Sequence, residues 1–261
     1  MAHAVLIQSY APAPLPAWQQ RCVDSVRAWA QQVGWEYRYV DDRLLEVVPQ
    51  WYRERCAGQK LPVTDLGRLL LLREALAEAG CAEALWIDAD VLVFAPGLDP
   101  RCAEGFAFAR EFWLTRDARN QVRAFQRVNN SLLYMRRGSP VLASYIALCE
   151  RVIAETPPQD IRHDTAGTGL LTRMAKDAAL PLIPGAALLS PLLVAALADG
   201  GSELLRRYAA LLPEPLVCAN LCASMVGRQM HGTVLDEPAM ERAVAALLAS
   251  GGGAINAFIP R

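Results

Sequence analysis

Residues 83–94 read EALWIDADVLVF and place two carboxylates, Asp88 and Asp90, within an otherwise apolar run. Alternation along an extended chain turns both side chains toward the same side. Two like charges held this close in a buried place are costly unless protonation or a cation relieves their repulsion. An apolar strand that ends in paired acids therefore predicts a strand of an α/β sheet with a ligand site at its C-terminal end.

The segments before this strand alternate between strand-like and helix-like patterns. Three of them predict a strand over residues 4–8, an amphipathic helix over 18–33 and a strand over 36–40. Residues 64–80, TDLGRLLLLREALAEAG, predict a helix that Thr64 caps, with Asp65 in its first turn and Gly80 at its end. This β, α, β order indicates an α/β fold with a mostly parallel central sheet flanked by helices.

The rest of the chain continues the alternation. We expect strands over residues 106–109 and 131–135, and helices over 140–153 and 240–248. Residues 178–198 are uncharged and about as long as a membrane span of roughly 20 residues. Pro181, Pro184 and Pro191 interrupt any single helix there, so a strand over 180–183, a loop and a core helix are expected instead. No repeat divides the chain, and we expect one domain over residues 1–261.

The overall composition excludes some classes of function. Twenty-six basic residues stand against 27 acidic ones, so a nucleic-acid surface built on bulk positive charge is not expected. The seven cysteines include no C-x-x-C pair, which is typical of reduced thiols in a cytoplasmic protein. The N-terminus lacks the pattern of a signal peptide. We therefore expect a cytoplasmic protein without an integral membrane span, and leave self-association into a homo-oligomer open.

Asp65 and Arg68 stand three residues apart on the helix before the acidic strand, so both project from one helix face. A carboxylate that accepts hydrogen bonds beside a guanidinium that donates them suits a sugar ring or a phosphate. The same spacing also suits a simple intrahelical ion pair. A purely structural interpretation is also possible for Asp88 and Asp90, in which one carboxylate caps the next turn and the other is solvated.

Together, TDLGR at residues 64–68 and LWIDADVLVF at 85–94 resemble the nucleotide-sugar-dependent glycosyltransferases of the GT-A fold. The first is similar to the S/T-D-x-x-R pattern of the DXD sugar-binding branch, and the second to the YLDADVLV string of the glycogenin-like branch. Further similarities are VNNSLLYMRRGSP (128–140), DTAGTGLLT (164–172), LIPGAALLSP (182–191) and MHGT (230–233). AGCAEALW at 79–86 and NNS at 129–131 depart from the two branches, which leaves the transferred sugar open.

The resemblance implies a GT-A, Rossmann-like domain with a hexosyltransferase activity. The enzyme would move a sugar from a UDP- or GDP-sugar donor to a carbohydrate, lipid-linked or protein acceptor, with retention of anomeric configuration, as in polysaccharide biosynthesis. Mn²⁺ or Mg²⁺ would be the cofactor. Position by position, the resemblance implies the metal ligands Asp88, Asp90 and His231, the donor-binding residues Asp65, Arg68, Asp88 and Asn130, and the catalytic residues Asp88, Asp90 and Asp164.

Three alternatives remain open from the sequence. An inverting transferase would need a carboxylate base that faces the acceptor, for which Asp117, Glu111 and Asp164 are candidates. An apolar strand followed by D-x-D-V also resembles the first motif of HAD-type phosphohydrolases, with the first Asp as nucleophile and the second as general acid. These enzymes need a later Lys, and Lys176 is the only one downstream. The third alternative is a GT-A homologue that binds sugar without catalysis.

Overall fold

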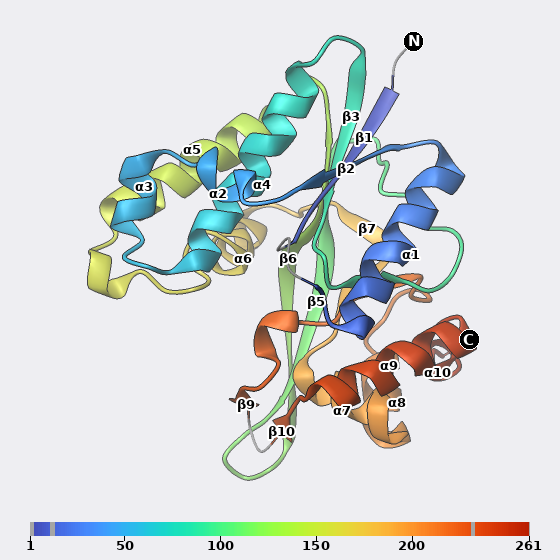
Figure 1. Cartoon of the computed structure of the whole chain (residues 1–261). Helices are drawn as coiled ribbons and strands as arrows, with labels where there is room; N and C mark the ends of the chain where they lie inside the picture. Colours follow the sequence, from blue (N-terminus) through green and yellow to red (C-terminus); the bar gives the residue numbers. More distant parts are fainter. Residues whose placement is uncertain (1–2, 11–13, 231–232, 261) are drawn as a thin grey trace.

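The computed structural model of the protein describes residues 3–10, 14–230 and 233–260. Its centre is an eight-stranded sheet with the order β2-β1-β3-β6-β5-β7-β8-β4, and helices pack around this sheet (Figure 1). The strands are β1 (His3–Ser9), β2 (Glu36–Val40), β3 (Cys81–Ile87), β4 (Val91–Val93), β5 (Phe106–Arg116), β6 (Val122–Arg136), β7 (Leu182–Leu188) and β8 (Cys218–Asn220). A short antiparallel pair, β9 (Gln229–Met230) and β10 (Thr233–Val234), lies outside this sheet.

The strand directions confirm the predicted α/β class with a mostly parallel central sheet, as in a GT-A-like fold. β1 pairs parallel with both β2 and β3, and β7 pairs parallel with both β5 and β8. β6 runs antiparallel between β3 and β5, and β4 runs antiparallel to β8 at the sheet edge. Six of the eight strands therefore run in one direction. The C-terminal ends of β1, β3, β7 and β8 consequently lie at the same end of the sheet. Open α/β sheets bind ligands at this end of their strands.

Helices cover the sheet on both sides. They are α1 (Ala17–Val33), α2 (Arg43–Glu46), α3 (Gln50–Arg55), α4 (Lys60–Ala77), α5 (Pro140–Glu155), α6 (Thr168–Asp177), α7 (Pro191–Asp199), α8 (Ser202–Ala209), α9 (Glu237–Ser250) and α10 (Gly253–Asn256), with 3₁₀ turns at Pro158–Asp160 and Ala223–Met225. Helices α2 to α6 lie on one side of the upper sheet, α1 lies on the other, and α7 to α10 gather at the lower end (Figure 1).

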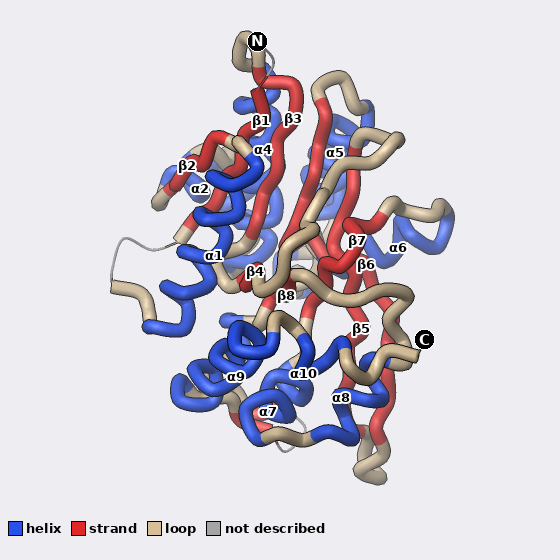
Figure 2. The backbone as a smooth tube through the Cα atoms, turned by 90° about the vertical axis from the view of Figure 1, so that its right-hand side faces the viewer, coloured by secondary structure: helices blue, strands red, loops and turns tan. Residues whose placement is uncertain are grey.

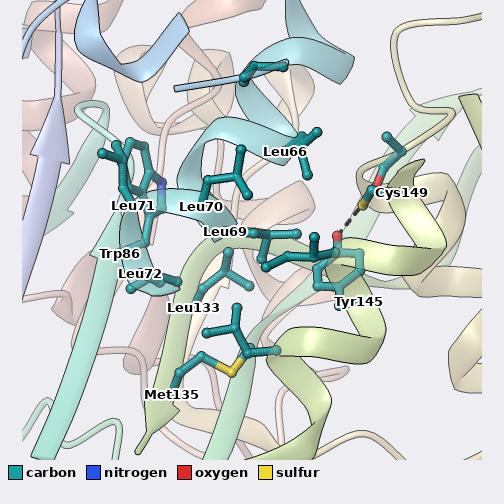
Figure 3. Close-up of a cluster of buried hydrophobic side chains, with 14 of the residues drawn as sticks. Leu66, Leu69, Leu70, Leu71, Leu72, Trp86, Leu133, Met135, Tyr145 and Cys149 are labelled. Carbon is teal, nitrogen blue, oxygen red and sulfur yellow. Dashed lines mark hydrogen bonds between the residues drawn. The ribbon is translucent and has the colours of Figure 1, made fainter. Parts of the chain in front are cut away.

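The central part of helix α4, residues 62–72, is almost completely buried, which explains its unbroken leucine run. A helix that is apolar on every side must be enclosed. The leucines at 66 and 69–72 pack with Trp86 of β3, Leu133 and Met135 of β6, and Tyr145 and Cys149 of α5 (Figure 3). This packing fixes α4 against the strand that ends in the acidic pair, so the polar residues on the helix are held toward the sheet edge.

The predicted N-cap of α4 is wrong. The helix begins at Lys60, and the Oγ1 of Thr64 donates to the carbonyl of Leu61 at 2.9 Å from within the first turns. Pro62 did not stop the helix, because a proline in the first turn removes an N–H that has no partner there. The C-terminal prediction was nearly right, since α4 ends at Ala77 and Gly80 turns the chain with a φ of +84°.

Strands β5 and β6 are much longer than the sequence predicts. They form a hairpin of 11 and 15 residues that projects beyond the rest of the sheet (Figures 1 and 2). Arginine, asparagine and glutamine in its outer half made this part resemble a loop. The hairpin is nevertheless stabilised on one face, where Phe112, Leu114 and Val122 pack into the core shared with α7 and α9.

The uncharged segment 178–198 contains strand β7, a short loop and helix α7. The interpretation as strand, loop and helix is confirmed, although the strand starts at Leu182 and extends to Leu188. Pro184 lies within β7, and Pro191 begins α7, where the fixed φ of proline is tolerated. Within the described residues, no helix combines the length and apolar character that crossing a membrane requires.

Candidate active site

A cavity of about 620 Å³ opens at the edge of the sheet where the parallel strands end. Six of the seven site residues that the resemblance implies line it together: Asp65, Arg68, Asp88, Asp90, Asn130 and Asp164. They come from α4, the turn after β3, the middle of β6 and the turn before α6. The seventh, His231, lies outside the described residues.

Asp88 lies immediately after β3 and is held by its main chain and its side chain. Its N–H donates to the carbonyl of Ser131 on β6 at 2.8 Å, and its carbonyl accepts from the Nε2 of Gln8 at 3.2 Å. Its Oδ1 accepts from the Nε1 of Trp86 at 2.6 Å and lies 3.2 Å from the Nη1 of Arg68. Asp88 is therefore held by the three strands β1, β3 and β6 and by helix α4, and its carboxylate is oriented by Trp86 and Arg68.

Arg68 is 6% exposed and connects α4 with two other elements. Its Nη1 donates to the carbonyl of Asn130 at 2.7 Å, and its Nη2 lies 3.5 Å from the Oδ1 of Asp65. Burial lowers the pKa of the guanidinium, but Asp88 and Asp65 outweigh this and the net shift is upward. The intrahelical ion pair considered from the sequence is present, yet Arg68 also pairs with Asp88 and so belongs to a larger network.

Asp65 is 5% exposed, and its Oδ1 accepts from the Nδ2 of Asn130 at 2.8 Å. Burial raises the pKa of this carboxyl to about 6, although Arg68 and the Asn130 hydrogen bond act in the opposite direction. The main chain at Gly167 comes so close that a Cβ there would lie 2.3 Å from the Oδ2 of Asp65. Only glycine fits at this position, because any side chain would displace the carboxylate.

Asp90 faces the last strand of the parallel set. Its Oδ1 accepts from the Nδ2 of Asn220 at 2.6 Å, and its Oδ2 accepts from the N–H of Ala223 at 2.7 Å. Burial, followed by repulsion from Asp88, raises the pKa of Asp90 to about 6. Burial also raises the pKa of Asp88, against the opposing effect of Arg68. Neighbouring positive charge therefore does not fully compensate the negative charges of the Asp88 and Asp90 carboxylates.

The carboxylate oxygens of Asp88 and Asp90 are suitable ligands for a hard divalent cation. Carboxylate oxygens are the ligands that Mg²⁺ and Mn²⁺ prefer, and each carboxylate keeps lone pairs beyond those that its present partners use. The raised pKa values of Asp88 and Asp90 indicate that added positive charge would be stabilising there. In the part of the chain that the structure describes, no three His, Cys, Asp and Glu side chains are arranged so that they could hold a metal ion together.

A second part of the cavity wall, the hairpin wall, comes from β5 and β6 and includes Glu111, Trp113, Arg127 and Asn129. Glu111 is 2% exposed, and its Oε2 accepts from the Nδ2 of Asn129 at 2.8 Å. Arg127 is more distant, with its Nη1 3.9 Å from the Oε1 of Glu111. Burial raises the pKa of Glu111, opposed by Asn129 and Arg127. Of the candidate bases, Glu111 and Asp164 line the cavity, whereas Asp117 lies in the turn at the hairpin tip, outside the cavity wall.

Sequence reasoning missed several residues of the cavity wall, among them Trp113, Arg127, Asn129, Thr168 and Asn220. A usable signal existed for Asn220, because it ends a short apolar strand and thus falls at the ligand-binding edge. The hairpin residues carried no such signal. Their position depends on a strand register that the alternation of residues did not reveal.

No protein-family model matches the chain, and no curated protein sequence matches it. The solved structures to which the chain is similar include two glycosyltransferases and one synthase. A glycosyltransferase involved in glycosylation of the major capsid of PBCV-1 has 11% identity and a TM-score of 0.42, covering 85% of this chain and 93% of that one. A 4-diphosphocytidyl-2C-methyl-D-erythritol synthase from Anaerococcus prevotii has 10% identity and a TM-score of 0.31, covering 72% and 89%.

The third structure is a β-1,4-galactosyltransferase 7 of Drosophila, determined with manganese, UDP-Gal and xylobiose. It has 11% identity and a TM-score of 0.28, with coverage of 67% of this chain and 74% of that one. These TM-scores are all below 0.5. The assignment of an activity therefore depends on the residues of the cavity itself.

Proposed function

We propose that the protein is a metal-dependent glycosyltransferase that moves a hexose from a UDP- or GDP-sugar to an acceptor hydroxyl, with retention of anomeric configuration. One observation carries the proposal. Residues of separate segments, Asp65 and Arg68 of α4, Asp88 and Asp90 after β3, and Asn130 of β6, line one cavity at the C-terminal edge of the parallel strands. Such an edge is where open α/β folds bind nucleotides.

Asp88 and Asp90 would hold Mn²⁺ or Mg²⁺, with His231 as the third ligand that the sequence resemblance implies. When bound, this cation would neutralise charge that develops on the departing nucleoside diphosphate. The protein contributes by keeping the two carboxylates in place. Trp86 and Arg68 hold Asp88, while Asn220 and the N–H of Ala223 hold Asp90. Ligands fixed in this way need no reorganisation before the transition state.

Asp65, Arg68 and Asn130 would bind the sugar of the donor. Asp65 engages its Oδ1 with Asn130 and leaves acceptor capacity at its Oδ2, which suits a sugar hydroxyl. Arg68 supplies fixed positive charge beside Asp88 and so suits the donor's phosphates. Because Asp65 and Arg68 are both nearly inaccessible to solvent, these interactions are screened less than surface contacts. Asp164, in the turn before α6, also lines the cavity and is proposed to contact the acceptor.

The cavity gives less support to the phosphohydrolase alternative. That chemistry needs a lysine beside the phosphate, and neither Lys60 nor Lys176 lines the cavity. Asp88, the nucleophile in that mechanism, is also engaged by Trp86 and Arg68, which reduces its freedom to attack.

The test is a panel of UDP- and GDP-hexoses incubated with Mn²⁺, with Mg²⁺ or with EDTA. We expect one donor to release its nucleoside diphosphate only when the cation is present. Asp99→Asn serves as a matched control, because Asp99 is an exposed aspartate outside the cavity. Donor binding without release would favour the sugar-binding alternative. Hydrolysis of p-nitrophenyl phosphate in the absence of donor cleavage would favour the phosphohydrolase and overturn the proposal.

A further inference from the structure

One face of the β5–β6 hairpin continues outward from the cavity. It consists of three register pairs, Glu111 with Arg127, Trp113 with Phe125, and Thr115 with Arg123, and we call these six residues the hairpin face. Paired residues of antiparallel strands share one face, and so do alternate residues along a strand. Glu111, Trp113 and Arg127 line the cavity. Phe125 and Arg123 therefore extend the same surface beyond the cavity rim.

The other face of the hairpin is already in use. Phe112, Leu114 and Val122 alternate with the residues of the hairpin face. They pack into the core that includes residues of α7, α8 and α9. The hairpin projects past the remaining strands of the sheet (Figures 1 and 2). A rigid, anchored strand pair thus presents the hairpin face next to the cavity mouth.

Two aromatic rings lie at the centre of this face. Phe125 is 50% exposed, and Trp113, its register partner, is half-buried at the cavity wall. Large apolar side chains exposed beside a cavity are characteristic of binding surfaces. Flat rings offer an apolar face that packs well against the C–H face of a pyranose ring.

Charged side chains flank these rings. On the hairpin face, Arg123 and Arg127 stand with one carboxylate, Glu111. Arg127 is too far from Glu111, at 3.9 Å, for a hydrogen bond, so its guanidinium keeps donors for a ligand. Arg123 donates to Asp117 and Gln121 at 2.9 and 3.0 Å, and its side chain is more than half exposed, so its other N–H donors are accessible to a ligand. Guanidinium groups bind carboxylates and phosphates in a bidentate manner.

We propose that the hairpin face binds the acceptor, and that the acceptor is a saccharide chain carrying carboxylate or phosphate groups. This inference rests on the proposed function, because only a transferase requires an acceptor beside its donor site. Trp113 and Phe125 stack on sugar rings of the chain, and Arg127 and Arg123 pair with its acidic groups. The two arginines are four residues apart, roughly 14 Å along a strand, so the face contacts more than one sugar residue.

The test measures binding by calorimetry on the full chain without any donor. The probes are matched pairs of tetrasaccharides: cellotetraose with its C6-carboxylate form, galactotetraose with tetragalacturonate, and mannotetraose with tetramannuronate. We expect the acidic member of at least one pair to bind about tenfold more tightly, as one charged hydrogen-bonded contact provides. A C6-phosphate form of the preferred tetrasaccharide then separates carboxylate from phosphate as the natural charge.

Variants of single residues test whether the saccharide binds to the hairpin face. Arg127→Gln is expected to remove the preference for the acidic member, and Arg127→Lys to restore part of it. Phe125→Ala should weaken both members of the pair by a similar factor, since stacking does not depend on charge. Gln126→Ala is the matched control, because Gln126 is exposed on the same strand but points to the opposite face.

Two results would overturn the inference: equal affinity for neutral and acidic members in every pair, or no saccharide binding at all. A change in the sedimentation of the protein on Phe125→Ala, without a change in saccharide affinity, would instead make the hairpin face a contact between copies of the chain. Nucleotide release from the donor panel is measured separately and without acceptor. If the protein cleaves donor but shows no preference for acidic saccharides, the proposed function stands and only this inference is wrong.

Discussion

The two walls of the cavity differ in how tightly their polar groups are bonded to one another. On the wall formed by α4 and the turn after β3, Arg68 contacts Asp65, Asp88 and the carbonyl of Asn130. On the hairpin wall, Glu111 has one close side-chain partner, Asn129, and Arg127 lies 3.9 Å away. A preorganised network suits a ligand that must be held in one geometry. A looser wall with exposed side chains suits a ligand that varies in length and composition.

Under the proposed function, this difference suits donor binding on the α4 and β3 wall and acceptor binding on the hairpin wall. Changes on the α4 and β3 wall should reduce donor turnover strongly, because several contacts depend on each residue. Changes on the hairpin wall should mainly affect which acceptor binds.

The largest effect is expected for Asp90→Asn. We expect metal-dependent donor cleavage to fall at least about 100-fold, because an amide is a poor ligand for a hard cation and several kcal/mol of stabilisation are lost. The melting temperature should change little, since the loss of one hydrogen bond is offset by relief of the repulsion from Asp88. Kinetics and calorimetry on this variant and on Asp99→Asn measure both effects. Near-normal cleavage would remove Asp90 from the proposed metal site.

A smaller but distinct effect is expected for Arg68→Lys. Lysine cannot reproduce the fork that reaches Asp88, Asp65 and the carbonyl of Asn130 at once. We expect kcat/KM for the donor to fall about tenfold or more. Arg73→Lys, on the exposed side of the same helix, is the control. Unchanged kinetics for Arg68→Lys would leave Arg68 with a structural role only, in the network with Asp65, Asp88 and Asn130.

The response of the melting temperature to Mn²⁺ should depend on pH. The folded-state pKa of Asp90 and of Asp65 is raised to about 6. Their contribution to stability is therefore complete below the ordinary carboxyl range near pH 4 and is lost as pH rises through about 6. A cation needs deprotonated ligands. Mn²⁺ at about 100 times its Kd should raise the melting temperature by about 5 °C at pH 7.5 and by much less at pH 5.

This pH dependence can be checked by thermal melts of the wild type and Asp90→Asn, with and without Mn²⁺, between pH 5 and 8. The variant is expected to lose most of the cation-dependent rise at pH 7.5. A rise of equal size at both pH values, or one that persists in the variant, would place the cation away from the acidic pair.

The smallest effect is expected for Glu111→Gln. Glutamine keeps an oxygen that can accept from the Nδ2 of Asn129, and a retaining transferase does not need a base at this position. We expect turnover to stay within about tenfold of the wild type. Glu104→Gln, in the exposed turn before β5, is the control. A loss above about 100-fold, the range of general-base catalysis, would instead favour an inverting mechanism with Glu111 as base.

The two walls also differ in how far the sequence predicted them. Asp88 and Asp90 were recognisable because their spacing within an apolar run is a local signal, and Asp65 and Arg68 because they are three apart on a helix. Six of the seven site residues that the resemblance implies line the cavity, and the seventh lies outside the described residues. Their roles in binding and catalysis stay predictions.

The hairpin wall could not be predicted in the same way. Its outer strands alternate between residues that face the lower helices and residues that face the cavity, but both sets include polar side chains. The register shift between Phe108 and Ala109 also breaks the alternation at the base of the hairpin. The position of Trp113 and Arg127 depends on cross-strand pairing, which is a tertiary property.

The turn before α6 and the first residue of that helix contact both walls, because the Nδ2 of Asn129 on the hairpin donates to the Oγ1 of Thr168 at 3.4 Å. The N–H of Gly169 donates to the carbonyl of Asp164 at 3.0 Å, and the main chain of Gly167 lies against the carboxylate of Asp65. We expect a ligand that displaces Asp164 to displace the backbone that confines Asp65 as well. Each substrate should consequently alter the equilibrium affinity for the other, and thermodynamic reciprocity requires the factor to be the same in both directions.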